Sequence, residues 1–180
     1  AFHIDGLTNE YDGDALFLRG GKVTAVPALT EVEIVAFGEY GDLEAFVTSG
    51  GTSTVPDTLE GQLAVYENKT LRYPGHVAAF KAFKDLGLFE RSTITVDGIA
   101  VSPREVFHAL LGPHIETDQV VDVCLMRAIG IGVLDGAETR VIVELVDRYD
   151  PTTGFAAMER LTGWHASIMA AFIAPPNRRW

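Results

Sequence analysis

Short apolar runs paired across glycine-containing turns constrain this chain more than any other feature. Gly20-Gly21, Asp97-Gly98 and Asp135-Gly136 are two-residue signals for tight turns between antiparallel strands. A fourth turn covers residues 38–41. The runs that these turns join are 15–18 with 22–26, 32–37 with 43–47, 93–96 with 99–101, and 119–132 with 139–146. We therefore expect antiparallel hairpins to supply most of the strands.

Helical segments interrupt the hairpins. Residues 77–86 have apolar side chains at helical spacing, and residues 6–11 fit a turn or short helix, whereas residues 1–4 fit the end of a strand. This order of elements predicts an α+β fold, with a mainly antiparallel or mixed sheet that carries helices on one face. We expect residues 1–174 to form a single domain and residues 175–180 to form a polar tail.

Another helix start is marked at Ser102. Pro103 suits the first helical position, and Glu105 completes a capping box with Ser102. The helix is expected to stop at Gly112-Pro113. His108, in its middle, is interpreted as a partly buried structural histidine.

The last predicted helix, residues 154–174, has apolar or small residues on every side. A helix of this kind should be buried, so a second surface must cover it. A homodimer contact or another domain could provide that surface.

Charge and composition exclude several classes of partner. The formal net charge of −11 argues against nucleic acid and anionic membranes, because both need a basic face. No apolar run approaches the ~20 residues of a membrane span, and no signal peptide is visible, so we expect a cytoplasmic protein. The lone Cys124 is interpreted as a small buried hydrophobe, and the five His lack metal-ligand spacing, so no metal site is expected.

The clearest candidate site is the junction between an expected strand, residues 63–71, and the helix 77–86. Pro74 and Gly75 should turn the chain sharply and present Arg72, Tyr73 and His76 together. An arginine can hold a carboxylate with two hydrogen bonds, and a histidine can move a proton near neutral pH. The alternative is a plain turn with a salt-bridged arginine and a capping histidine.

Two glycine pairs do not form nucleotide-binding motifs. Gly50-Gly51 is followed by no lysine, and no helical pattern opens directly behind it, so a phosphate-binding loop is disfavoured. In Gly130-Ile131-Gly132 the third glycine is missing, and a strand follows where a helix is required. The loop 49–56 could instead offer the hydroxyls of Ser53 and Thr54 to a substrate, or it could be an ordinary connection.

Several motifs resemble one family in the correct order. Residues 70–76, Thr-Leu-Arg-Tyr-Pro-Gly-His, are similar to the T-[LV]-R-Y-P-G-H segment of the saccharopine dehydrogenase family, most closely its lysine 6-dehydrogenase branch. Residues 6–11 are similar to the family's G-L-x-N-E-Y, and 29–33 to its L-T-E-V-E. Residues 43–58 resemble the segment L-E-A-F-x-T-x-G-G-x-S-T-x-P-x-T.

The resemblance implies the C-terminal substrate-binding and dimerisation domain of an oxidoreductase. That domain is an α+β unit similar to the C-terminal domain of glyceraldehyde-3-phosphate dehydrogenase-like enzymes. The parent enzyme would oxidise an amino-acid C–N centre by hydride transfer to NAD or NADP. The family's nucleotide-binding domain is not found in this sequence, so we expect no dinucleotide to bind to this piece. The substrate could be lysine, saccharopine or a carboxylated polyamine.

Residue roles are carried over through the matching motifs. Arg72 would pair with the substrate carboxylate, and Glu10 or His76 would take the proton from the substrate ammonium. The remaining candidates are polar: Asn9, Ser53, Thr54 and Tyr73 for the substrate, and Thr162 and Gly163, at a helix start, for the cofactor. The alternative for Glu10 is a solvated or capping carboxylate, and for Asn9 a turn former.

A different class of function is also open. The chain could be a stand-alone ligand-binding or dimerisation module that is not catalytic. In either case the expected partners are a small amino-acid substrate, a nucleotide-binding domain and a second copy in a homodimer.

Overall fold

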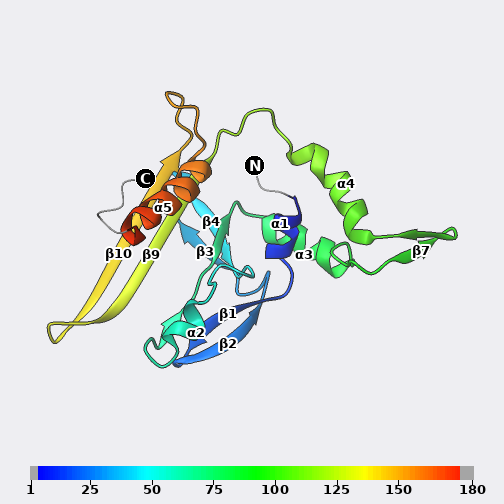
Figure 1. Ribbon diagram of the computed structural model, residues 1–180. Coiled ribbons are helices and arrows are strands. Elements are labelled where there is room, and N and C mark those ends of the chain that lie inside the picture. Colours follow the sequence, from blue (N-terminus) through cyan, green and yellow to red (C-terminus); the bar gives the residue numbers. More distant parts are fainter. Residues whose placement is uncertain (1–3, 175–180) are drawn as a thin grey trace. The chain divides into compact units, whose positions relative to one another are not determined.

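The computed structural model describes residues 4–174. Its contacts divide the chain into two compact units, residues 1–116 and 117–180, and each unit is described by itself (Figure 1). Helices and antiparallel sheets contribute in similar proportion, 32% and 33% of the residues, so the expected α+β class is confirmed. Within the described residues the paired strands are distributed over four separate sheets.

The first sheet of unit 1 has the strand order β2-β1-β5. Strands β1 (Asp14–Arg19) and β2 (Lys22–Pro27) form the predicted hairpin. Gly20 and Gly21 make the turn with φ of 58° and 78°, a left-handed conformation that suits glycine. The short strand β5 (Val65–Tyr66) pairs with the other edge of β1.

The second sheet has the order β3-β4-β6 and carries the candidate site. Strands β3 (Glu33–Ala36) and β4 (Asp42–Phe46) form the second predicted hairpin, around the 3-10 turn η1 (Gly38–Tyr40). Strand β6 (Thr70–Arg72) pairs with β4, which places Arg72 opposite Glu44.

The expected single strand over residues 63–71 is wrong. The segment forms β5 in one sheet and β6 in another. The three polar residues between them bond to different parts of unit 1: Glu67 to Arg19, Asn68 to the Gly51 carbonyl, and Lys69 to Glu33. These separate partners explain why the chain leaves one sheet and joins the next.

Four helices complete the described part of unit 1. They are α1 (Ile4–Glu10), α2 (Val55–Leu59), α3 (His76–Asp85) and α4 (Pro103–Ile115). The small hairpin of β7 (Ile94–Val96) and β8 (Ile99–Val101) matches its prediction, with Asp97 and Gly98 at φ of 49° and 81°. Ser102 accepts a hydrogen bond from the Glu105 N–H, as expected for the N-cap of α4.

Three local predictions for unit 1 are corrected. Ile4 begins α1 instead of ending a strand, and residues 1–3 lie outside the described part. A helical turn, α2, does follow the Gly50-Gly51 loop, because Pro56 fits the first turn of a helix. Helix α4 continues through Pro113 to Ile115, since a proline near the end of a helix removes one bond without breaking the earlier turns.

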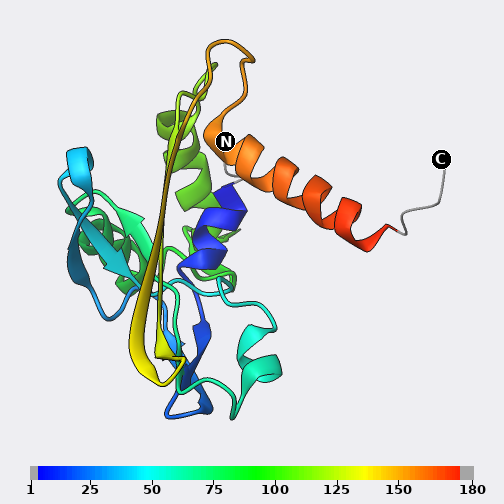
Figure 2. The ribbon, with the colours of Figure 1, turned by 90° about the vertical axis from the view of Figure 1, so that its left-hand side faces the viewer.

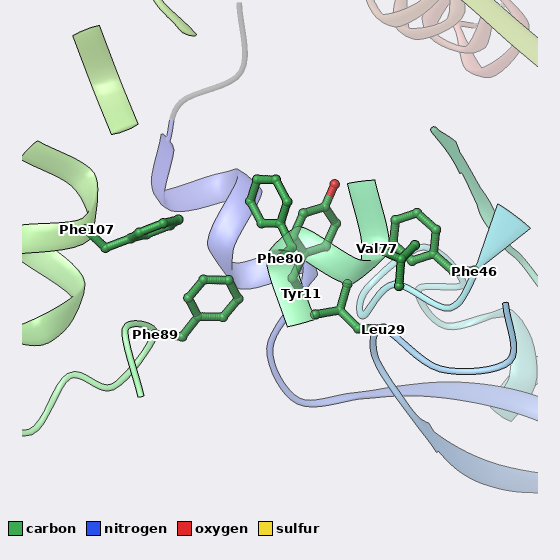
Figure 3. Close-up of a cluster of buried hydrophobic side chains, with 7 residues drawn as sticks. All are labelled: Tyr11, Leu29, Phe46, Val77, Phe80, Phe89 and Phe107. Carbon is green, nitrogen blue, oxygen red and sulfur yellow. The ribbon is translucent and has the colours of Figure 1, made fainter. Parts of the chain in front are cut away.

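The core of unit 1 is a mainly aromatic cluster. Figure 3 shows Tyr11 and Phe80 in the middle, between Phe89 and Phe107 on one side and Phe46 on the other. Leu29 and Val77 complete the buried set. Burying each large apolar side chain contributes roughly 1.5–3 kcal/mol, so this cluster holds α1, α3 and α4 together with β4. Tyr11 is the member that brings a polar group into it.

The described part of unit 2 contains one long hairpin and one helix. Strands β9 (Val123–Leu134) and β10 (Ala137–Arg148) pair along their full length as a ribbon seen edge-on in Figure 2. Asp135 and Gly136 form the predicted turn, and β9 begins later than expected. Helix α5 (Ala157–Ile173) contacts β9.

Within the described residues unit 2 lacks the second surface that the sequence requires for α5, and the burial prediction for Cys124 is wrong. Helix α5 buries only its N-terminal part, at Ala157 and Arg160, whereas Phe172 is 80% exposed. The hairpin has just two strands and covers only one stripe of this mainly apolar helix. Cys124 is half-buried, and burial together with the nearby Asp122 and Asp147 raises the pKa of its thiol.

No helix in the described part of the chain combines the length and the hydropathy that crossing a bilayer requires.

Candidate functional site

The junction between β6 and α3 is held by a carboxylate from the neighbouring strand. Gly75 has φ of +94°, a left-handed conformation, and offers no side chain to cap α3. Glu44 on β4 accepts hydrogen bonds from the backbone N–H groups of Gly75 (3.0 Å) and Val77 (3.1 Å). These two bonds lower the pKa of the Glu44 carboxyl and fix the position of the first residue of α3, which is His76.

The His76 ring is turned into the aromatic core. It stacks on Phe80 with 4.4 Å between ring centroids, and its Nε2 lies 2.8 Å from the Tyr11 hydroxyl. Burial, followed by the nearby Arg72 cation, lowers the pKa of His76 to about 4. The imidazole is therefore neutral at pH 7.

Tyr11 is the site residue that sequence reasoning missed. Its side chain is fully buried, and burial raises the pKa of its hydroxyl, while Arg72, as a cation and hydrogen-bond donor, acts in the opposite direction. The Arg72 cation thus lies near the hydroxyl, which shares a hydrogen bond with the neutral His76 ring. Tyr11 ends the motif that carries Asn9 and Glu10, but an aromatic residue after a short helix indicates a core position as readily as a site.

Glu10 lies near enough to Arg72 for the cation to act on its carboxyl. Burial raises the pKa of the Glu10 carboxyl, and the Arg72 cation partly offsets that effect. Arg72 donates one hydrogen bond to the Leu71 carbonyl at 2.9 Å, which leaves further donors on its guanidinium. The structure thus brings Glu10, Arg72 and His76 together around Tyr11, and these four residues are called the corner cluster below.

A hollow of about 260 Å³ opens beside the corner cluster. Its lining is neutral and polar apart from one carboxylate: Glu10, Thr48, Ser49, Gly50, Gly51, Asn68 and Thr70. The Thr48 and Thr70 hydroxyls are 2.8 Å apart, and the Ser49 N–H donates to the Glu10 carbonyl at 2.8 Å. No side chain in the described part of the chain is hydrogen-bonded to the Glu10 carboxylate, which is free to meet a ligand in the hollow.

The other predicted substrate residues lie at different positions. Asn9 turns its amide oxygen to Arg104 (2.8 Å) and Arg91 (3.0 Å). Ser53 and Thr54 lie on the turn before α2 and do not belong to the lining of the hollow. Tyr73 is 63% exposed at the surface beside Arg72.

The predicted cofactor residues lie within a helix of unit 2. Thr162 and Gly163 belong to unit 2 and lie inside α5, which begins at Ala157, so the expected helix start at this pair is wrong. Inside a helix the backbone N–H groups are already bonded and cannot hold a pyrophosphate. Only the exposed Thr162 hydroxyl and the open surface at Gly163 are available to a ligand. Among residues 4–174, no group of acidic, His and Cys side chains could hold a metal ion.

The chain matches a known protein family over almost its whole length. The family model described as the saccharopine dehydrogenase C-terminal domain matches residues 1–177. This agrees with the motifs at residues 6–11 and 70–76, which the fold places together in the corner cluster. The chain therefore belongs to the saccharopine dehydrogenase C-terminal domain family, a family of oxidoreductase domains.

Proposed function

We propose that this chain is the substrate-binding domain of an NAD(P)-dependent amino-acid dehydrogenase of the lysine 6-dehydrogenase type. One observation carries the proposal: Glu10 lines an open polar hollow near the Arg72 cation, and Tyr11, also near Arg72, shares a hydrogen bond with His76. A carboxylate beside a guanidinium can receive the two charged groups of an amino acid, its ammonium and its carboxylate.

Arg72 has the role of carboxylate clamp. Its guanidinium donates to the Leu71 carbonyl and lies near the buried Tyr11 hydroxyl, so its direction is restrained before a ligand arrives. A preset fork of donors loses less freedom on binding a carboxylate than a flexible lysine does. The clamp would fix the substrate carboxylate beside the hollow.

Glu10 is a better candidate than His76 for taking the proton from the substrate ammonium. Glu10 lines the hollow, whereas the His76 ring lies between aromatic side chains with Nε2 bound to Tyr11. Burial raises the pKa of Glu10, which makes its carboxylate a stronger base than an exposed one. His76 then orients Tyr11, and through it Arg72.

The charges favour a substrate with one carboxylate at this end. The hollow is lined by neutral polar groups and by Glu10, and none of its seven lining residues is basic. Saccharopine brings three carboxylates, and the extra ones would meet Glu10 with no cation in the lining. Lysine or a carboxylated polyamine brings one carboxylate and an amine, which match Arg72 and Glu10.

The dinucleotide would accept the hydride, and we propose that a nucleotide-binding domain outside the described residues carries it. The exposed surface of α5 at Thr162 and Gly163 is then the part of this chain that faces the cofactor-bearing domain. Glu10, Arg72, Tyr11 and His76 bind and orient the substrate and move its proton, and they take no part in accepting the hydride.

The test measures NADH and NADPH formation by the natural protein that contains this chain, with lysine, saccharopine and carboxylated polyamines. In Arg72→Ala we expect a 10- to 100-fold rise of KM, roughly the value of one charge-assisted bond. In Glu10→Gln we expect kcat to fall by about 10²-fold or more with a smaller change of KM, since the base is lost.

The matched control is Arg19→Ala, which removes an exposed arginine paired with Glu31 and Glu67 on the same unit. Its KM and kcat should equal those of the unmodified protein. If KM were unchanged in Arg72→Ala, Arg72 would not bind the substrate carboxylate, and the corner cluster would have only a structural role. If the unmodified protein turns over no amine with either dinucleotide, the dehydrogenase proposal fails.

A second function, dimerisation, is supported by the hairpin of unit 2. Ile131 and Val133 on β9 are 70% and 75% exposed, and Val141 and Val143 on β10 are also exposed. Monomers rarely leave so large an apolar ribbon in water. We propose that a second copy covers it in a homodimer.

Sedimentation velocity at micromolar concentration tests the dimer. The unmodified chain should sediment as a dimer, and Ile131→Lys with Val133→Lys should sediment as a monomer. Val65→Lys, at an exposed position of β5, is the control and should remain dimeric. An unmodified chain that sediments as a single monomeric species would overturn this second proposal.

A further inference from the structure

Arg104 holds both ends of the segment that carries Glu10 and Tyr11. Its side chain is 5% exposed although it lies in the first turn of α4. The guanidinium donates from Nη1 to the Asn9 amide oxygen and from Nη2 to the Asp12 carboxylate, both at 2.8 Å. Nε donates to the Phe89 carbonyl at 2.7 Å. Glu10 and Tyr11 are the two residues between these anchor points.

Other bonds restrain the same four residues. The Ser49 hydroxyl donates to the Asn9 carbonyl at 2.7 Å, and Lys84 donates to the Tyr11 carbonyl at 3.0 Å. Arg91 adds a second bond to the Asn9 amide oxygen. Because both guanidinium groups can only donate, the oxygen of the Asn9 amide must face them. The Asn9 side chain is therefore committed to the protein at the atom that would otherwise accept from a substrate ammonium.

We propose that Arg104 is a positioning residue, which acts through Asn9 and Asp12 to hold Glu10 in the hollow and Tyr11 under Arg72. The inference rests on the proposed function, because it assumes that Glu10 and Arg72 meet the substrate. Under this proposal Asn9 does not contact the substrate. Its amide oxygen instead accepts the hydrogen bond by which Arg104 holds the end of α1.

The pKa of the Glu10 carboxyl can report whether the segment 9–12 is held in place, because that pKa depends on burial and on the charged groups nearby. On the strand side Arg72 faces the carboxyl and lowers its pKa, while the residues of the hollow are neutral. On the helix side Arg104, Arg91 and Lys84 bond to Asn9, Asp12 and the Tyr11 carbonyl. Burial has the larger effect and raises the pKa of Glu10. Loosening the segment should expose the carboxyl and move its pKa down toward its ordinary value.

The first experiment titrates the side-chain carboxyl of Glu10 by carbon-13 NMR on this chain, with the resonance assigned from Glu10→Gln. We expect a pKa above the ordinary glutamate value in the unmodified chain and a lower one in Arg104→Lys and Asn9→Ala. A lysine has one point of contact and cannot reach all three acceptors. Asn9→Ala is the second variant because Asn9 is exposed, so that variant should fold if Arg104→Lys does not. An unchanged Glu10 pKa in a folded variant overturns the proposal.

The second experiment compares kinetics in the natural protein. Asn9→Ala and Arg104→Lys should lower kcat about 10-fold with KM within about 3-fold, and Asn9→Asp, which keeps an acceptor oxygen, should recover most of the lost kcat. If the Asn9 oxygen instead accepted from the substrate ammonium, the new negative charge in Asn9→Asp would lower KM by more than about 3-fold, and that result overturns the proposal. Arg19→Ala is the control for surface arginines. If the unmodified protein showed no turnover, only the proposed function would be overturned. The role of Arg104 would still be decided by the NMR titration.

Discussion

The Tyr11 hydroxyl and the His76 Nε2 lie 2.8 Å apart and join the residue that follows α1 to the first residue of α3. The two rings also meet edge to face, with centroids 5.5 Å apart. The polar contact is thus enclosed by the same aromatic side chains that form the core of unit 1. Stability and the geometry of the candidate site depend on the same pair.

Tyr11→Phe removes only the hydroxyl and keeps the packing of the ring. We expect the free energy of unfolding to fall by about 1 kcal/mol, the usual net value of one hydrogen bond, plus any cost of leaving His76 without its partner. Urea unfolding followed by circular dichroism measures the loss. Tyr11→Ala, which also leaves a cavity, should cost about 3–5 kcal/mol, and equal losses in the two variants would show that the hydroxyl carries all of the effect.

His76 should make the protein sensitive to acid. The folded protein binds the His76 proton near pH 4 and the unfolded chain near pH 6.5, so the unfolded state binds more protons between these values. The stabilisation is complete above about pH 6.5 and is lost as the pH falls toward 4. His76→Gln should therefore lose less stability between about pH 7 and about pH 4.5 than the unmodified chain. The exposed His114→Gln serves as control, and equal pH dependence in all three proteins would refute the assignment.

Two glycines should respond to alanine in opposite directions. At Gly75 a Cβ would meet no atom within 4 Å, but φ of +94° is strained for alanine, so Gly75→Ala should destabilise by about 1–2 kcal/mol. Gly163 lies inside α5 with equally open surroundings and no positive φ, so Gly163→Ala should stabilise by about 0.5–1 kcal/mol. Thermal unfolding of both variants tests the pair, and a shift of the same sign in both would contradict the backbone explanation.

Asp122 should stabilise the start of α5. Its two carboxylate oxygens accept from the N–H groups of Ala157 (2.6 Å) and Met158 (2.9 Å). Asp122→Ala should cost about 1–2 kcal/mol, the value of a strong helix cap. Tryptophan fluorescence in urea reports this loss, because Trp164 lies in α5 and the sequence has no tryptophan before it. The exposed Asp118→Ala is the control; a similar loss there would argue against capping.

The hairpins could be predicted because their signals are local. Gly20-Gly21, Asp97-Gly98 and Asp135-Gly136 adopt the positive φ that such pairs favour, whatever surrounds them. The segment 63–71 could not be predicted in the same way, because two different sheets compete for its ends and side-chain partners far along the chain decide the division. The need for a second surface over α5 could be predicted from its many apolar residues, whereas the identity of that surface depends on what else is present to cover the helix.

The candidate site could be predicted in part. Glu10, Arg72 and His76 are recognisable as motif residues with useful chemistry, and the structure brings them together. Tyr11 and Arg104 carry no local signal: a tyrosine after a helix and an arginine in the first turn of another look like core and surface residues. Their importance arises from contacts between distant parts of the chain, and no spacing rule reports those.

The bond between Arg104 and Asn9 spans 95 positions of the chain, whereas the turn of the β9–β10 ribbon is closed by neighbours. Contacts between distant residues form slowly because a long loop must close first. The corner cluster can therefore reach its final geometry only after α4 has been synthesised and has docked on α1. A ribosome-bound chain that ends before residue 104 would contain Glu10, Tyr11, Arg72 and His76 and would still lack the anchor that sets their geometry.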